Sequence, residues 1–145
     1  MVQVDTVLAR LAAMNQYVDE LSQFRPLARD EFLGDLRNYR TVERDFQLAA
    51  QAAIDIASHI LVADFPHRPQ GYRQVIEALG EVSVLPPDLA ERFVMVASFR
   101  NILVHEYLEV DLDILYECLQ NDLDDFRLFG RYIADYLVRS GAVEE

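Results

Sequence analysis

VERDFQLAAQAAIDIASHILVA, residues 42–63, is the longest run of regularly spaced apolar side chains in the sequence. These side chains recur every three or four residues, which is typical of one face of an α-helix. Five alanines leave little side-chain volume, so that neighbours could pack closely on several sides: Ala49, Ala50, Ala52, Ala53 and Ala57. The pattern therefore predicts that this segment is the central helix of a helical protein.

Further helices are predicted before this segment. Residues 5–23 form an amphipathic pattern that ends before Pro26, because proline disrupts a helix interior. A shorter helix is expected over about residues 27–38, and Thr41 is a suitable N-cap for the central helix.

After the central helix, residues 65–71 (FPHRPQG) predict a loop. A short helix over Tyr72–Leu79 follows, with Gly80 expected just beyond its end. The sequence LPPD at 85–88 predicts the start of a helix that continues to about residue 105. A last long helix is expected over about 112–137, with Asp111 as its cap and a stop near residue 141.

The composition favours a soluble globular protein with one domain over residues 1–145, since 52% of the residues are hydrophobic and 26% are charged. Five glycines and five prolines are too few for the many turns of an all-β fold. We therefore expect an all-α, up-and-down bundle of about four long helices with one or two short ones.

The charge balance excludes a protein that coats nucleic acid. The chain has 13 arginines and no lysine against 25 acidic residues, which gives a formal net charge of −12. Binding to DNA is therefore not expected, although a local arginine cluster remains compatible with this charge.

Other features favour a cytoplasmic protein without membrane contact, metal or cofactor. Cys118 is the only cysteine, so an internal disulfide and a cysteine-based zinc site are excluded. The first 20 residues lack the pattern of a secretory signal, and no stretch approaches 18 uncharged apolar residues. The Glu-x-x-His pairs of di-iron bundles, phosphate-binding glycine loops and nucleophile elbows are also missing.

One polar line follows a face of the central helix, because Arg44, Gln51, Asp55 and His59 are spaced by seven, four and four residues. This line could be the solvated side of the helix. It could equally face a cleft or a partner, where Asp55 and His59 would pair.

The segment 98–107 (SFRNILVHEY) combines three groups that suit phosphoryl transfer. The guanidinium of Arg100 can bind a phosphate, the imidazole of His105 can transfer a proton near neutral pH, and the phenol of Tyr107 can donate or accept a hydrogen bond. Cleavage of RNA needs a base, an acid and a positive charge, but no metal. On a regular helix, Arg100 and His105 point about 140° apart. The two side chains could therefore meet through the reach of Arg100, at a frayed helix end, or through a second copy of the chain, which a two-fold dimer would supply.

Residues 100–107 resemble the Arg-x4-His-x-Tyr motif of the HepT toxins, which form MNT/HepT toxin–antitoxin pairs and belong to the HEPN ribonuclease superfamily. Residues 42–61 and 85–92 are similar to further blocks of this family and occur in the same order. The resemblance implies an all-helical homodimer with a metal-independent endoribonuclease site at its two-fold axis.

The resemblance also implies roles for individual residues. His105 would transfer protons, Arg100 would bind the scissile phosphate, and Asn101 would orient the substrate or His105. Tyr107 would be adenylylated by an MNT-type nucleotidyltransferase antitoxin, as in type VII-like pairs, which would silence the toxin. Asp55, which lies within residues 42–61, is expected near the cleft at the two-fold axis.

Two other functions remain compatible with the sequence. In the first, the chain is a non-catalytic subunit that binds a nucleotide or substrate for a nucleotidyltransferase. In the second, it is a generic dimerising bundle. The combination of Arg100, His105 and Tyr107 favours the nuclease, because a scaffold does not need all three.

Overall fold

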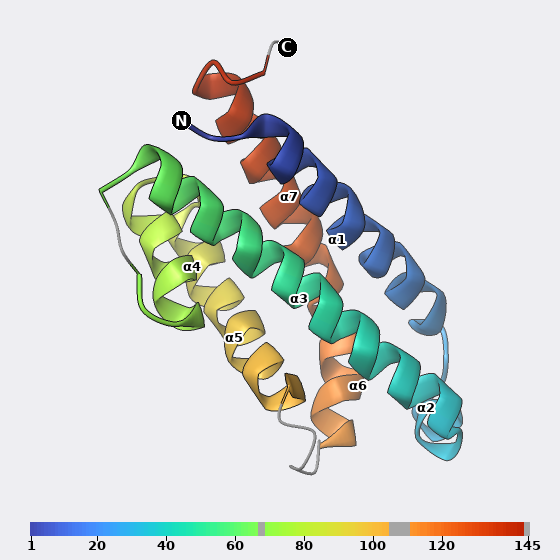
Figure 1. Ribbon diagram of the computed structural model, residues 1–145. Coiled ribbons are helices and arrows are strands. Elements are labelled where there is room, and N and C mark those ends of the chain that lie inside the picture. The colour runs from blue at the N-terminus through green and yellow to red at the C-terminus, as the bar shows by residue number, and fades with distance from the viewer. Residues whose placement is uncertain (67–68, 105–110, 144–145) are drawn as a thin grey trace.

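The computed structural model of the protein describes residues 1–66, 69–104 and 111–143. Regular secondary structure within these ranges is entirely helical (Figure 1). The helices are α1 (Val4–Phe24), α2 (Arg29–Gly34), α3 (Leu36–Asp64), α4 (Tyr72–Glu81), α5 (Pro87–Val104), α6 (Leu112–Asn121) and α7 (Leu123–Arg139).

The long helices alternate in direction along the chain. Figure 1 shows α1 and α3 running antiparallel, α5 antiparallel to α3, and α6 with α7 returning toward the end where α1 begins. The expected all-α, up-and-down bundle with additional short helices is therefore confirmed.

Helix α3 is the centre of the bundle. It contacts α1, α2, α4, α5 and α6, and the five alanines named in the sequence analysis are buried. Among the described residues, α3 is also the one helix long and apolar enough to cross a membrane. However, 56% of its most apolar stretch is buried within the bundle, as is usual for the core helix of a soluble protein.

The predicted start of α3 is wrong. The helix begins at Leu36, because Asp35 is its N-cap and accepts a hydrogen bond from the backbone N–H of Arg37 (2.9 Å). Thr41 lies inside the helix, where its hydroxyl donates to the carbonyl of Arg37 (2.6 Å). The short helix before it is correspondingly limited to α2.

Two predictions about the later helices are also wrong. The segment after Asp111 forms two helices, which meet at Asp122, although Asp111 does cap the first of them. Gly80 lies inside α4 rather than beyond its end, and the residue in the left-handed region is Ser83 (φ 63°). A Cβ atom at position 80 would lie 2.8 Å from the Cβ of Ala90, so a close approach of α4 to α5 explains this glycine.

A cluster of phenylalanines joins three helices in the core. Phe46 of α3 packs edge-on against Phe99 of α5 and Phe126 of α7, with ring centroids 5.9 and 5.7 Å apart. Phe93 packs against Phe126 and stacks on Phe129. The cluster fixes α5 against the bundle up to the residue that precedes Arg100.

Candidate functional site

Arg100 lies near the end of α5, and its neighbour Phe99 anchors that end in the core. Asn101 belongs to the same helix, which ends at Val104. The predicted site residues His105 and Tyr107 lie outside the residues that the structure describes. The described part of the candidate site therefore consists of Arg100 and the groups packed around it.

The guanidinium of Arg100 lies over the aromatic ring of Tyr72, with its Cζ atom 4.4 Å from the ring centroid. This distance is typical of a cation–π interaction. The side chain is half-buried, and its Nε atom is buried without a hydrogen-bond acceptor among the described residues. None of the ion pairs described for this part of the chain includes Arg100.

Tyr72 is placed by the start of α4. The preceding residue, Gly71, has φ 96°, a conformation that glycine adopts without strain. The next residue, Arg73, donates from Nη1 to the Oγ atom of Ser98 on α5 (3.1 Å). The first turn of α4 is thus attached to the last turns of α5 through two neighbouring side chains. Tyr72 and Arg73 were not predicted as site residues, because their only signal in the sequence is an aromatic–basic pair at the start of a short helix.

Asp55 lies on the side of α3 that faces α1 rather than toward Arg100. It accepts hydrogen bonds from Nη1 of Arg10 (3.0 Å) and from Nε2 of Gln51 (2.7 Å), so it ties α3 to α1. Arg100 instead contacts α4, and no hydrogen bond or ion pair joins it to Asp55. The structure thus does not bring these two predicted site residues into contact.

The polar line on α3 is used largely for contacts within the chain. His59 does not pair with Asp55, because its Nε2 atom accepts the backbone N–H of Gln3 (3.0 Å). Arg44 is exposed and donates to Gln47 within α3. Asp55 and His59 therefore help to hold the start of α1 against α3.

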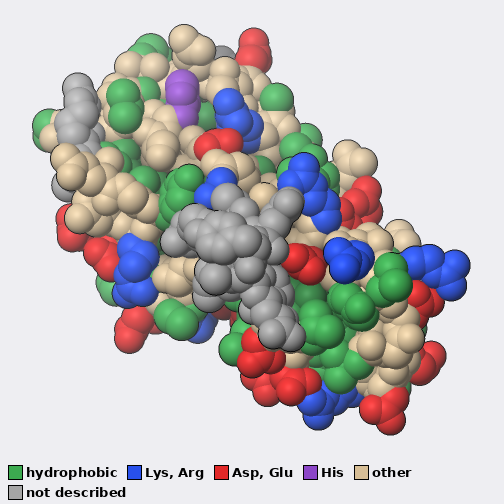
Figure 2. All heavy atoms as spheres, turned by 60° about the horizontal axis from the view of Figure 1, so that its bottom comes forward, with side chains coloured by type: hydrophobic (Ala, Val, Ile, Leu, Met, Phe, Trp, Pro, Cys, Tyr) green, Lys and Arg blue, Asp and Glu red, His purple; other side chains and the backbone are tan. Residues whose placement is uncertain are grey.

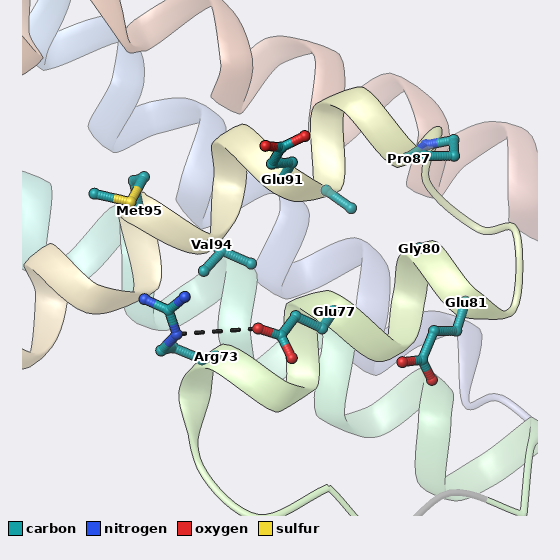
Figure 3. A pocket seen from close by; sticks show the side chains of 9 residues that line it. Arg73, Glu77, Gly80, Glu81, Pro87, Glu91, Val94 and Met95 are labelled. Atoms are coloured by element: carbon teal, nitrogen blue, oxygen red, sulfur yellow. Dashed lines mark ion pairs between the residues drawn. The ribbon is translucent and has the colours of Figure 1, made fainter.

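The structure describes a separate groove of about 620 Å³ between α4 and α5. Gly80, Ala90, Val94 and Met95 form its apolar walls with Pro87, while Figure 3 shows Glu77, Glu81 and Glu91 around it. Arg73 lies at one end, 4.0 Å from Glu77. Because three carboxylates surround this groove, it is unsuited to the phosphates of RNA.

The other candidate reactive groups are poorly suited to nucleophilic catalysis or to metal binding. The pKa of Cys118 is raised to about 12, chiefly by burial and in smaller part by the nearby carboxylate of Asp122. The thiol therefore stays protonated and is a poor nucleophile. Among the described residues, no group of three or more His, Cys, Asp or Glu side chains is arranged to hold a metal ion.

The face of the molecule in Figure 2 shows arginines interspersed with acidic side chains rather than a continuous basic surface. The net charge of −12 agrees with this distribution. This face therefore offers individual arginines rather than a general positive field for contacts with phosphate.

Comparison with known proteins identifies the family. The sequence model described as "Ribonuclease HepT-like" matches residues 14–133, which include α3, α5 and Arg100. The chain belongs to the HepT-like ribonuclease family. The family resemblance inferred from the motif is confirmed, as is the enzyme class expected from it.

Individual members of the family are similar over most of their length. The tRNA nuclease HepT of Aphanizomenon flos-aquae is 32% identical over 129 residues, which cover 89% of this chain and 88% of that protein. The mRNA nuclease HepT of Shewanella oneidensis is 27% identical over 125 residues, which cover 86% and 93%.

A solved structure of a HEPN toxin supports the same assignment. The tri-AMPylated HEPN toxin of Shewanella oneidensis, in complex with its MNT antitoxin, superposes with a TM-score of 0.82 at 27% identity. The match covers 90% of this chain and 98% of that toxin. The HepT-like bundle is therefore shared along nearly the whole chain.

Proposed function

We propose that the protein is a cytoplasmic endoribonuclease toxin that cleaves RNA without a metal ion, using Arg100 and His105. The observation that supports this most directly is the state of Arg100. Its guanidinium is held on a ring, unpaired with any described carboxylate, and begins the Arg-x4-His-x-Tyr motif of a ribonuclease family. An arginine kept in this state is suited to bind a phosphate.

The chemistry follows from the two side chains. A base removes the proton of the ribose 2′-hydroxyl, the 2′-oxygen attacks phosphorus, and the 5′-oxygen leaves with a proton from an acid. The products are a 2′,3′-cyclic phosphate and a 5′-hydroxyl end. In this proposal His105 transfers protons, because imidazole titrates near neutral pH, and Arg100 stabilises the additional negative charge of the transition state.

Two supporting roles remain predictions. Asn101 follows Arg100 directly and would orient the substrate or His105. Asp55 is proposed to support the site indirectly, since its bonds to Arg10 and Gln51 fix α3 against α1.

The first experiment compares wild-type protein with His105→Ala and Arg100→Ala on total RNA and on cell growth. We expect His105→Ala to fold normally. Its cleavage rate should fall by about 100-fold or more, because an acid–base residue contributes about 10²- to 10⁴-fold. Growth inhibition should disappear with cleavage.

His59→Gln is the matched control, because His59 accepts a backbone hydrogen bond far along α3 and is expected to leave cleavage unchanged. Normal cleavage by His105→Ala would refute the assignment of the acid–base residue. Wild-type activity should also survive a chelator, and its loss on chelation would refute the metal-independent mechanism.

We further propose that an MNT-type antitoxin silences this toxin by adenylylating Tyr107. Support comes from the similar Shewanella oneidensis toxin, which is tri-AMPylated in complex with its MNT antitoxin. An adenylyl group on Tyr107, seven residues after Arg100 in the same motif, would add a bulky, negatively charged phosphodiester, which would exclude an RNA phosphate by volume and by charge.

Co-expression with such a nucleotidyltransferase should add the mass of adenylyl units to the peptide that contains Tyr107. Tyr107→Phe should escape both the added mass and the silencing. Tyr116 is an internal control, because its hydroxyl already donates to the carbonyl of Leu27 (2.8 Å). No added mass, or adducts on Tyr116 or Tyr132 instead, would contradict the proposal.

A further inference from the structure

Tyr72 is the described side chain that determines how the Arg100 guanidinium lies. The ring lies at 4.4 Å from Cζ, and no described hydrogen bond or ion pair competes with it for the orientation of Arg100. An arginine can be positioned either by a carboxylate or by an aromatic ring. A carboxylate would neutralise the charge and occupy the N–H groups, whereas a ring attracts the face of the guanidinium and leaves its edge available.

The position of the ring is itself fixed by α4. At one end of this helix, Arg73 donates to Ser98, two residues before Arg100 on α5. At the other end, the missing side chain of Gly80 allows the backbone of α4 to pack closely against Ala90 of α5. These two attachments hold α4 along α5, so the ring of Tyr72 is presented to Arg100 by a rigid element.

The Nε atom of Arg100 supports a functional reason for this arrangement. It is buried without an acceptor among the described residues, although buried donors in proteins are usually hydrogen-bonded. The contact with Tyr72 therefore does not serve to satisfy the hydrogen-bonding groups of Arg100. It fixes the side chain and preserves its charge, which is what recognition of an anion requires.

We propose that Tyr72 is a positioning residue for RNA cleavage, whose ring holds the guanidinium plane of Arg100 so that its outer N–H groups meet the scissile phosphate. This inference rests on the proposed nuclease function. Tyr72 acts only through Arg100, and its hydroxyl takes no part. The ring should therefore be replaceable by another ring but not by an aliphatic side chain of similar size.

The test compares Tyr72→Leu with Tyr72→Phe under single-turnover conditions on total RNA. Tyr72→Leu should slow cleavage about 5- to 30-fold, the range that a partly desolvated cation–π contact implies. Tyr72→Phe should stay within about twofold of the wild type, because it retains the ring. Tyr132→Leu is the matched control: Tyr132 is also a half-buried helical tyrosine, but it lies on α7. Tyr132→Leu should change thermal stability to an extent similar to that of Tyr72→Leu, but it should leave cleavage unchanged.

A double-mutant cycle separates positioning from general damage to the fold. In an Arg100→Ala background, Tyr72→Leu should produce no further loss of the residual rate. A wild-type rate in Tyr72→Leu, or an equal loss in both backgrounds, would overturn the proposal.

A binding measurement distinguishes failure of this inference from failure of the nuclease proposal. The probe is a mixed-sequence 2′-O-methyl RNA oligonucleotide, which lacks the attacking hydroxyl and cannot be cleaved by the proposed reaction. Tyr72→Leu should weaken its binding at least fivefold, whereas Tyr72→Phe and Tyr132→Leu should not. If the wild type binds this probe but cleaves no RNA, the nuclease proposal fails. Loss of binding in Tyr72→Leu would then still support its role toward Arg100, and unchanged binding would overturn it.

Discussion

Asp45 is a carboxyl group that α3 buries against Glu20 of α1, and only 8% of its surface is exposed. Its pKa is raised from 3.8 to about 6, chiefly by burial and in smaller part by the neighbouring carboxylate of Glu20. Below about pH 4, Asp45 is protonated in both the folded and the unfolded chain. Between about pH 4 and 7 the unfolded chain ionises first, so the stability of the fold falls as the pH rises.

We therefore expect Asp45→Asn to stabilise the protein at pH 7.5 by about 1 kcal/mol, a value reduced for partial solvent screening of the pair. The gain should shrink toward pH 4.5, where the wild-type carboxyl is largely protonated. Urea denaturation of Asp45→Asn and of the wild type at several pH values measures this gain in the free energy of unfolding. Asp135→Asn, at an exposed position on α7, is the control and should show no such dependence. A gain independent of pH would mean that burial of the charge is not the cause.

At the scale of single residues, the sequence predicts Arg100 as a site residue but does not show what holds its side chain. The motif predicts a phosphate-binding arginine from its spacing to residues 105 and 107. The contact with Tyr72 depends on how α4 packs along α5, and nothing in the local pattern of residues 72–79 predicts that packing. Asp55 shows the same limit, because its partner Arg10 is 45 residues away.

At the scale of helices, the apolar pattern predicted which segments are helical but not where two of them begin and end. Leu115, Leu119, Leu123 and Phe126 are all buried on both sides of the break at Asp122. Because their spacing continues across the break, the pattern cannot distinguish one helix from two. The start of α3 was missed for a different reason: both Asp35 and Thr41 are acceptable N-caps, and only the observed hydrogen bonds distinguish them.

The packing of α4 on α5 gives a prediction at this scale. Alanine normally stabilises a helix interior by about 1 kcal/mol relative to glycine. At position 80, however, the new Cβ would lie 2.8 Å from the Cβ of Ala90, which cannot rotate away. Overpacking typically costs about 1–3 kcal/mol. Gly80→Ala should therefore destabilise the protein and also slow RNA cleavage, because α4 carries Tyr72.

Gly34→Ala is the control for this variant, because a Cβ atom there would meet nothing within 4 Å. It should not destabilise the protein and should leave cleavage unchanged. Thermal unfolding and cleavage of total RNA are the two measurements. A Gly80→Ala protein as stable as the wild type would show that α4 can shift along α5 without cost.

At the scale of the whole molecule, the net charge limits how RNA can be bound. A charge of −12 repels a polyanion, so an extended footprint on the surface is not favoured. Binding must be concentrated where individual arginines are kept unpaired, and two copies of such a site would double the local positive charge. The same acidic surface would favour an antitoxin that is basic where it meets the toxin.

The last prediction concerns the homodimer and whether its two copies share each site. On one regular helix, Arg100 and His105 would point about 140° apart, so a continuous regular helix would not direct both at the same phosphate, whereas two copies of the chain could. The described surface also exposes large apolar side chains, including Leu36, Val62 and Met95, which a partner could cover. Light scattering at micromolar concentration should give about twice the chain mass of 16.7 kDa.

Mixing two inactive variants tests the shared site directly. Arg100→Ala retains His105, and His105→Ala retains Arg100, so a mixed dimer contains one complete site if each site takes its arginine from one copy and its histidine from the other. After equal mixing and subunit exchange, half of the dimers are mixed, and the cleavage rate should recover to about one quarter of the wild type. Each variant alone should stay inactive. No recovery in a mixture shown to exchange subunits would mean that each chain supplies both residues to its own site, and a fully active monomer would exclude the dimer as a requirement.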